Sequence, residues 1–246
     1  MNKILILKTG NTIKPLLDQG EDFEDWIIAG SGLSQQYFTV ISVFRNEKLP
    51  AIETVAGVIV TGSPAYVTDH EPWNEKSANY LKRAVECDIP VLGICYGHQL
   101  LAYSLGGKVG FHPHGREIGT VNVRLEECAL DDPLFCDLPV QLPVQVSHQQ
   151  TVMALPEGSI LLATNPFEPH HAFRYGSCAW GVQFHPEFSA HIMQTYLQER
   201  REAIEAEQLD YQKLAAEVSE ALESTKLLKN FVSLVYLNQK TAHLIN

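Results

Sequence analysis

The sequence predicts an α/β fold, an open and mostly parallel twisted sheet with helices on both faces. Apolar runs at residues 3–8, 38–44 and 55–60 have the length of strands, and loop or helical segments follow them. Strands that alternate with helices favour a parallel sheet that is buried on both faces. Ligands of such sheets bind at the carboxyl ends of the strands.

The third of these runs leads toward a fourth strand. A turn-like sequence, TGSP at residues 61–64, stops the run at residues 55–60. Residues 73–86 then carry apolar side chains at helical spacing, and a short apolar run follows at residues 89–92. We therefore expect a helix that leads into a buried strand.

The second half of the chain is richer in strand signals. Residues 118–125 alternate between apolar and polar side chains, and strand-like runs recur across residues 145–184. We expect a smaller antiparallel element packed beside the main sheet. The last run, at residues 178–184, predicts a buried or half-buried strand.

The character of the sequence changes after Ser189. Residues 190–238 contain neither Gly nor Pro and carry apolar residues at helical spacing, which predicts two or three helices. We expect a main domain at residues 1–189 and a helical extension at residues 190–246, packed on or next to the core. Acidic residues dominate residues 199–223, as on a solvated helix face. The alternative is an appendage that packs on the core or supports self-association into a homo-oligomer.

Length and charge exclude several classes of protein. The 246 residues suffice for one α/β domain with its own core, and a second domain is not required. The net charge of −11, with no basic cluster, argues against nucleic acid or an anionic membrane as a partner. The apolar run at residues 4–7 is too short for a signal peptide or a membrane span. We expect a cytoplasmic protein.

The cysteines and histidines predict neither disulfides nor a metal site. The chain has five cysteines, an odd number without C-x-x-C spacing, which fits reduced thiols in the cytosol. Two histidine groups, at residues 112–114 and 170–171, lack the spacing of a closed zinc site. No metal and no other cofactor is predicted.

One heptapeptide, GICYGHQ at residues 93–99, indicates an activated cysteine. The apolar run before it and the helical sequence after it place Cys95 on a tight turn from strand to helix, and Gly93 and Gly97 permit the bend. The thiol then lies at a helix N-terminus, where the helix dipole favours the thiolate. A thiolate is the form that attacks a carbonyl carbon.

A matching base follows much later in the chain. His185 and Glu187 come at the end of the strand predicted at residues 178–184, and residues two apart in an extended chain point to the same side. Pro186 favours that extended conformation. Glu187 can then orient His185, which leaves the other ring nitrogen as the base for Cys95. Alone, each motif also fits a structural core residue, but together they favour a triad.

These motifs resemble those of the class I glutamine amidotransferases, over residues 3–189. The resemblance implies a flavodoxin-like sheet and a Cys, His, Glu triad, Cys95, His185 and Glu187, that hydrolyses the side-chain amide of glutamine. Three further segments, at residues 5–10, 20–26 and 115–120, look most like those of free-standing members related to the amidotransferase domain of GMP synthetase.

The resemblance also implies an oxyanion hole. Tyr96 follows the nucleophile and is the natural first backbone donor, because the helix begins there. The second donor should come from the turn after the third strand, where residues 62–64 match the Gly-Gly-Pro turn of the family with Ser63 in place of the second Gly. Either residue of that turn can make the contact.

The same resemblance implies a set of substrate-binding residues. Gln99 lies one helical turn past Cys95 and resembles a glutamine-binding residue of the family. Ser147, His148 and Gln149 resemble the loop that closes over the substrate's α-amino and α-carboxylate groups. Gln150 stands where the GMP synthetase pattern has Asp, which weakens a strict preference for free glutamine.

The sequence contains no phosphate-binding loop of the Walker or ATP-pyrophosphatase type, so nothing in it is expected to activate an ammonia acceptor. Three functions remain open. The chain can supply ammonia to a separate ATP-dependent synthetase subunit. It can act alone on glutamine or on a γ-glutamyl peptide. It can also keep the fold as a non-catalytic binding or regulatory module.

Overall fold

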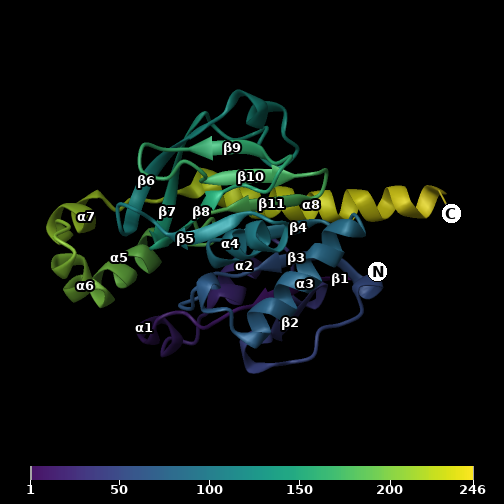
Figure 1. Ribbon diagram of the computed structural model, residues 1–246, viewed down its shortest axis with the longest axis horizontal. Coiled ribbons are helices and arrows are strands. Elements are labelled where there is room, and N and C mark those ends of the chain that lie inside the picture. Colours follow the sequence, from purple (N-terminus) through teal and green to yellow (C-terminus); the bar gives the residue numbers. More distant parts are fainter. Residues whose placement is uncertain (1, 246) are drawn as a thin grey trace.

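The computed structural model describes the backbone of residues 2–245 and the side chains of residues 2–237. A central nine-stranded sheet has the order β2-β1-β3-β4-β11-β10-β9-β6-β7, and β5 and β8 form a separate antiparallel pair (Figure 1). The strands are β1 (Lys3–Lys8), β2 (Phe38–Ser42), β3 (Val55–Val60), β4 (Val91–Ile94), β5 (Lys108–Phe111), β6 (Glu117–Leu125), β7 (Gln141–His148), β8 (Gln150–Ala154), β9 (Ile160–Thr164), β10 (Ala172–Tyr175) and β11 (Ala179–Val182).

Helices cover both faces of the sheet, as the sequence predicts. The α-helices are α1 (Lys14–Leu17), α2 (Phe23–Ser31), α3 (Pro72–Glu86), α4 (Tyr96–Ser104), α5 (Ala190–Glu199), α6 (Arg201–Ala206), α7 (Tyr211–Glu217) and α8 (Leu222–Ile245). Alternate residues of β1 enter different cores. Ile4 and Ile6 pack in the cluster that contains residues of α2 and α8, whereas Leu5 and Leu7 pack in the cluster of α3 and α4.

The parallel half of the sheet consists of β2, β1, β3, β4 and β11. Every residue of β3 and β4 is buried, which explains why both strands are continuous apolar runs in the sequence. The strand predicted at residues 89–92 begins at Val91 because Pro90 has no N–H to donate. The Pro90 carbonyl still accepts a 2.8 Å hydrogen bond from the Val58 N–H.

The strand predicted at residues 38–44 is shorter, because residues 43–45 turn into a 3-10 helix. The antiparallel strands also differ from the expectation of an element packed beside the main sheet. The four strands β10, β9, β6 and β7 continue that sheet, because β11 pairs with β4 on one side and with β10 on the other. Within the described residues, the separate element is the β5–β8 pair alone.

Between residues 190 and 245 the structure has four helices, where the sequence predicts two or three. Buried side chains of α8, among them Leu228, Phe231 and Val235, join the core cluster of β1 and β3. Tyr196 and other residues of α5 pack with Phe23 of α2. The helices therefore share cores with the preceding residues, and the domain boundary at residue 189 stays a prediction.

The acidic segment, residues 199–223, is largely exposed to solvent, as expected for a solvated helix face. Helix α6 buries Ile204 alone, and α7 buries none of its residues. Figure 1 shows α5, α6 and α7 at one end of the long axis, while α8 runs along the axis toward the other end. In the part of the chain that the structure describes, no helix combines the length and apolar character needed to cross a membrane.

Candidate active site

Cys95 occupies the turn between β4 and α4 in a strained conformation. Its φ of 52° and ψ of −102° are rare for a residue with a side chain. A 2.8 Å hydrogen bond from its N–H to the Val182 carbonyl holds the turn on β11. A Cβ atom on Gly93 would collide with the Gly97 carbonyl, and one on Gly97 would lie 2.5 Å from the Val60 carbonyl oxygen. Both glycines are therefore required by close packing around the cysteine.

His185 and Glu187 lie just beyond β11 and contact each other. The His185 Nδ1 is 2.7 Å from the Glu187 Oε1, and both side chains are buried. The His185 ring stacks on Phe188, with centroids 4.0 Å apart, and lies nearly parallel to Phe23 at 6.2 Å. These two aromatic rings fix the plane of the imidazole. Neither ring is among the site residues predicted from the sequence.

Cys95 and His185 influence each other's charge. Burial raises the pKa of the Cys95 thiol, but the His185 cation and its hydrogen bond, together with His148, lower it by more, so the pKa is below its ordinary value. Burial lowers the pKa of His185, but Glu187 and Cys95 outweigh it and raise that pKa to about 10. The site therefore favours a thiolate beside an imidazolium.

The turn after β3 is fastened to the end of β1. The Thr9 hydroxyl donates to the Gly62 carbonyl at 2.9 Å, and the Ser63 hydroxyl donates to the Thr9 carbonyl at 2.8 Å. A Cβ atom on Gly62 would lie 2.8 Å from the Cε1 of His185. Gly62 is thus needed for close approach to the imidazole, while the Ser63 side chain is used within the turn.

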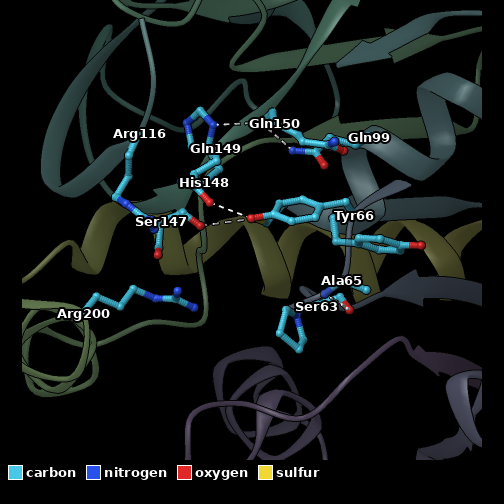
Figure 2. Close-up of a pocket in the computed structure, with 13 residues that line it drawn as sticks. Ser63, Ala65, Tyr66, Gln99, Arg116, Ser147, His148, Gln149, Gln150 and Arg200 are labelled. Atoms are coloured by element: carbon cyan, nitrogen blue, oxygen red, sulfur yellow. Dashed lines mark hydrogen bonds between the residues drawn. The ribbon is translucent and has the colours of Figure 1, made fainter. Parts of the chain in front are cut away.

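Tyr96 is the first residue of α4, so its backbone N–H has no acceptor within the helix. The N–H groups at this helix start and at the turn of Gly62 and Ser63 both belong to segments beside Cys95. Ser63, Tyr96 and Cys95 line one cavity of about 60 Å³ (Figure 2). Of the three residues predicted for an oxyanion hole, Ser63 and Tyr96 line this cavity, whereas Gly62 lies against the His185 ring.

Gln99 lines the same cavity as Cys95. Its Nε2 donates to the Gln150 carbonyl at 2.7 Å and to the Gln183 Oε1 at 3.0 Å. The Nε2 of Gln183 lies 3.6 Å from the Cys95 sulfur. Gln183 is not among the residues predicted from the sequence, although it lies two residues before His185 and so points to the same side of an extended chain.

Ser147, His148 and Gln149 also line this cavity, at the tight connection between β7 and β8 rather than on a free loop. The Ser147 carbonyl oxygen is 3.9 Å from the Cys95 sulfur. The Gln149 Oε1 accepts a 2.6 Å hydrogen bond from the hydroxyl of Tyr66. Gln150 donates from Nε2 to the Thr68 hydroxyl at 2.6 Å, while its buried Oε1 has no hydrogen-bond partner among the described residues.

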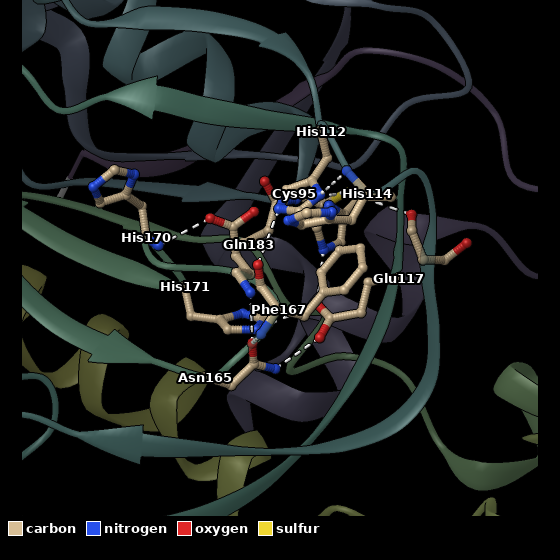
Figure 3. A network of polar contacts seen from close by, with 12 residues as sticks. Cys95, His112, His114, Glu117, Asn165, Phe167, His170, His171 and Gln183 are labelled. Carbon is tan, nitrogen blue, oxygen red and sulfur yellow. Dashed lines mark hydrogen bonds and ion pairs between the residues drawn. The ribbon is translucent and has the colours of Figure 1, made fainter.

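Both ring nitrogens of His148 are engaged away from the cavity. Its Nδ1 lies 3.0 Å from the Gln150 carbonyl oxygen and its Nε2 lies 3.0 Å from the Glu117 Oε2. Figure 3 shows the surrounding network, in which Asn165 donates to Glu117 at 2.7 Å and His171 lies 3.3 Å from it.

The ionisable groups of this network shift each other's pKa values. Burial lowers the pKa of His148, but Glu117 outweighs it and raises that pKa. Burial raises the pKa of Glu117, but the two histidines lower it by more, to below the ordinary range. Among the described residues, no group of three or more His, Cys, Asp or Glu side chains is arranged to hold a metal ion.

Two arginines at the cavity were not predicted as site residues. Arg116 forms a two-pronged ion pair with Glu207, at 2.9 and 3.0 Å. Arg200, at the end of α5, lies over the Tyr196 ring at 5.6 Å. Figure 2 shows both arginines opposite Ser63 and Tyr66. Arg200 lies past residue 189, so the helices after the main domain contribute to the site.

Cys95, His185 and Glu187 follow the carboxyl ends of two adjacent parallel strands, β4 and β11. A thiolate, an imidazole and a carboxylate arranged in this way are typical of a cysteine hydrolase. The family described as glutamine amidotransferase class-I matches residues 16–202. The chain therefore belongs to the class I glutamine amidotransferases, a family of cysteine-dependent amidohydrolases. The match extends past Ser189 and includes Arg200.

Curated relatives carry the name GMP synthase (glutamine-hydrolyzing). The protein from Bacillus subtilis strain 168 is 42% identical over 132 residues, which are 53% of this chain and 24% of that protein. The protein from Porphyromonas gingivalis strain W83 is 38% identical over 152 residues, 61% of this chain and 28% of that protein. The chain thus spans about a quarter of the length of these relatives.

Solved structures share the fold over nearly the whole chain. A glutamine amidotransferase from Thermotoga maritima superposes with a TM-score of 0.76 at 23% identity, covering 96% of this chain and 98% of that one. A glutamine amidotransferase from Methylobacillus flagellatus gives a TM-score of 0.66 at 24% identity, covering 96% and 90%. These likenesses establish the α/β architecture with its C-terminal helices.

Proposed function

We propose that this chain hydrolyses the side-chain amide of glutamine to glutamate and ammonia, with Cys95 as nucleophile. The observation that carries the proposal is the pairing of Cys95, on its strained turn, with the buried His185–Glu187 pair. The lowered pKa of Cys95 and the raised pKa of His185 support the thiolate and imidazolium that such a reaction needs.

In the first step the Cys95 thiolate attacks the γ-carbonyl carbon and forms a tetrahedral oxyanion. Backbone N–H groups of Tyr96 and of the Gly62 and Ser63 turn are proposed to stabilise that oxyanion. One well-placed donor lowers the barrier by about 3–4 kcal/mol. The strain at Cys95 helps, because it holds the sulfur at the start of α4, where the Tyr96 N–H is free of helical partners.

Collapse of the oxyanion breaks the C–N bond. His185 gives its proton to the leaving nitrogen, ammonia departs, and a γ-glutamyl thioester remains on Cys95. His185 then removes a proton from water, which attacks the thioester and releases glutamate. Glu187 keeps the imidazole oriented and stabilises its positive charge.

The amino acid end of the substrate is proposed to occupy the cavity lined by Gln99, Ser147, His148 and Gln149. Gln99 is held by Gln150 and Gln183 and is therefore preorganised. The ring nitrogens of His148 are already bonded, so its contribution is positive charge and the fixing of the strand connection rather than a direct hydrogen bond to substrate.

A steady-state assay of ammonia and glutamate release from glutamine tests this proposal. We expect turnover by the wild-type chain, loss of at least roughly 10⁴-fold in Cys95→Ala, and near wild-type rates in Cys87→Ala, which changes an exposed cysteine. Absence of turnover by the folded wild-type chain would favour the non-catalytic alternative.

We further propose that the ammonia serves a separate ATP-dependent synthetase subunit. The support is that the relatives matched here are named GMP synthase (glutamine-hydrolyzing), a name that joins glutamine hydrolysis to a synthase reaction. Glutamine turnover should rise at least about tenfold when a synthetase chain without its own amidotransferase is added together with ATP and its acceptor. A rate that is the same with and without that chain would argue for an enzyme that works alone.

A further inference from the structure

Two cavities meet at Cys95, and the second was not expected from the sequence. The cavity that contains Gln99 has a volume of about 60 Å³, and the other, which contains His185, has about 140 Å³. Both are lined by Cys95, Ser147 and Arg200. A substrate bonded to the sulfur would therefore have room on two sides.

The chemistry assigns a different part of the substrate to each cavity. The group that leaves must accept its proton from His185, so it departs on the side of His185. The acyl part then extends toward Gln99 and the β7–β8 connection. Ammonia is about as large as one water molecule, whose share of liquid volume is about 30 Å³. The cavity of about 140 Å³ beside His185 is several times larger than ammonia requires.

Arg200 gives this second cavity a positive charge. Within the described part of the chain no carboxylate pairs with Arg200, and its buried Nε has no hydrogen-bond partner. Arg116, the other arginine nearby, is neutralised by Glu207. The Tyr196 ring beneath Arg200 holds the guanidinium in place.

The remaining lining of the second cavity is uncharged apart from His185 and Cys95 and includes one further unpaired polar atom. The buried Oδ1 of Asn11 has no partner among the described residues and can accept an N–H of a substituted amine. No Asp or Glu is among the described residues that line this cavity. An anionic group beside Arg200 would therefore meet no carboxylate in the wall of the cavity.

We infer that the site accepts γ-glutamyl amides whose amine part is an amino acid, with the carboxylate of that amine bound by Arg200. This inference rests on the proposed function and extends its substrate class. The steps balance as for glutamine. Cys95 attacks the amide, the C–N bond breaks as His185 protonates the amine, and the free amino acid departs and leaves the γ-glutamyl thioester. Water then attacks the thioester and releases glutamate and Cys95.

Three substrates that share the γ-glutamyl group test the inference. They are glutamine, γ-glutamylethylamide, whose amine is neutral beyond the nitrogen, and γ-glutamylglycine, whose amine carries a carboxylate. For the wild-type chain we expect kcat/KM on γ-glutamylglycine to exceed that on γ-glutamylethylamide by roughly tenfold or more. In Arg200→Gln the ratio should fall toward one, and Arg200→Lys should restore part of it.

Arg201→Gln is the matched control, because Arg201 is the next residue, pairs with Glu205 and lines neither cavity. Its ratio should stay at the wild-type value. Circular dichroism of each variant verifies that it is folded. The ratio is measured within one variant, so a general loss of activity does not move it.

Each possible result supports or overturns the inference. Equal rates on the two amides, or a ratio that Arg200→Gln leaves unchanged, would overturn the inference while glutamine turnover keeps the proposed function. Turnover of glutamine alone would also overturn it and would favour ammonia supply to a synthetase. Absence of turnover on all three substrates would overturn both proposals.

Discussion

Two buried His–carboxylate pairs lie close to Cys95, and their different surroundings give them different roles. His185 pairs with Glu187 at 2.7 Å, and His148 pairs with Glu117 at 3.0 Å. The second ring nitrogen of His185 faces Cys95, whereas that of His148 is bonded to the Gln150 carbonyl. The same side-chain pair can therefore act in catalysis in one place and support the site in the other.

Position along the sheet explains the difference. His185 follows β11, which lies beside β4, so it reaches the carboxyl end of the strand that precedes Cys95. His148 ends β7, four strands farther across the sheet, and faces Glu117 at the start of the paired strand β6. Its charge still acts on Cys95 and lowers the pKa of the thiol.

The largest expected effect on kcat comes from removing the His185 ring nitrogen that faces Cys95. His185→Asn should lower kcat on glutamine by roughly 10⁴-fold, because it removes both the base and the proton donor. Removal of the cation should also raise the pKa of Cys95. The pH profile of alkylation by iodoacetamide should therefore shift to higher pH, and an unshifted profile would mean that His185 does not stabilise the thiolate.

Glu187→Gln should have the next largest effect. An amide in place of the carboxylate no longer stabilises the imidazolium, so kcat should fall by roughly 10²- to 10⁴-fold while KM changes little. Loss of the negative charge should lower the pKa of His185 from about 10. Steady-state kinetics and NMR titration of the ring measure the two effects, and full activity in this variant would remove Glu187 from the triad.

Glu117→Gln tests the other pair and should act mainly on stability. The buried His148 loses its counter-charge, so we expect the free energy of unfolding at pH 6 to fall by about 2–3 kcal/mol and kcat to fall less than about tenfold. Urea denaturation measures the first quantity. Glu127→Gln, on an exposed carboxylate, is the control. A loss of kcat as large as that of Glu187→Gln would contradict the supporting role.

The stability difference between the wild type and Glu117→Gln should depend on pH. The pKa of Glu117 is lowered on folding, so its contribution is present above the ordinary value near 4.5 and is lost as the pH falls toward the folded pKa. The pKa of His148 is raised, so its contribution is complete below the ordinary value near 6.5 and is lost as the pH rises through the folded pKa. Urea titrations across pH 3–9 should show the largest difference between pH 4.5 and 6.5, and a flat difference would contradict the pairing.

The smallest expected change in free energy is at the turn after β3. A Cβ at position 62 would lie 2.8 Å from the Cε1 of His185, so Gly62→Ala should displace the imidazole and lower kcat by roughly tenfold. Gly110→Ala is the matched control, because a Cβ there meets a flexible Met153 side chain at 3.4 Å. Equal activity of the two variants would show that the turn tolerates a side chain beside His185.

The parts of the fold and site that could be predicted depend on residues close together in the sequence. The strand that precedes Cys95 and the helix that follows it are adjacent in sequence, and His185 and Glu187 are two residues apart, so their geometry follows from strand periodicity. The helices on both faces follow from alternating apolar runs. The Tyr96 and Gly62 donors came from the family resemblance, and their catalytic roles stay proposals.

Contacts between distant segments could not be predicted. Glu117 and His148 are 31 residues apart and meet because β6 pairs with β7. Arg200 lines the cavities at Cys95 because α5 packs on β6 and shares a core cluster with α2. In the sequence, an isolated arginine at a helix end resembles any solvated cation. The antiparallel strands join the main sheet because β10 pairs with β11, which alternation within each strand does not specify.

The close packing of α8 on α2 and β3 matters while the chain is being synthesised. A Cβ on Gly30 of α2 would lie 2.6 Å from Leu228, and one on Gly57 of β3 would lie 2.6 Å from Val235. The helix is therefore seated directly on the glycines beneath it. During translation this face of the sheet stays open to water until residues 222–235 have left the ribosome, so the nascent protein exposes an apolar surface until α8 emerges.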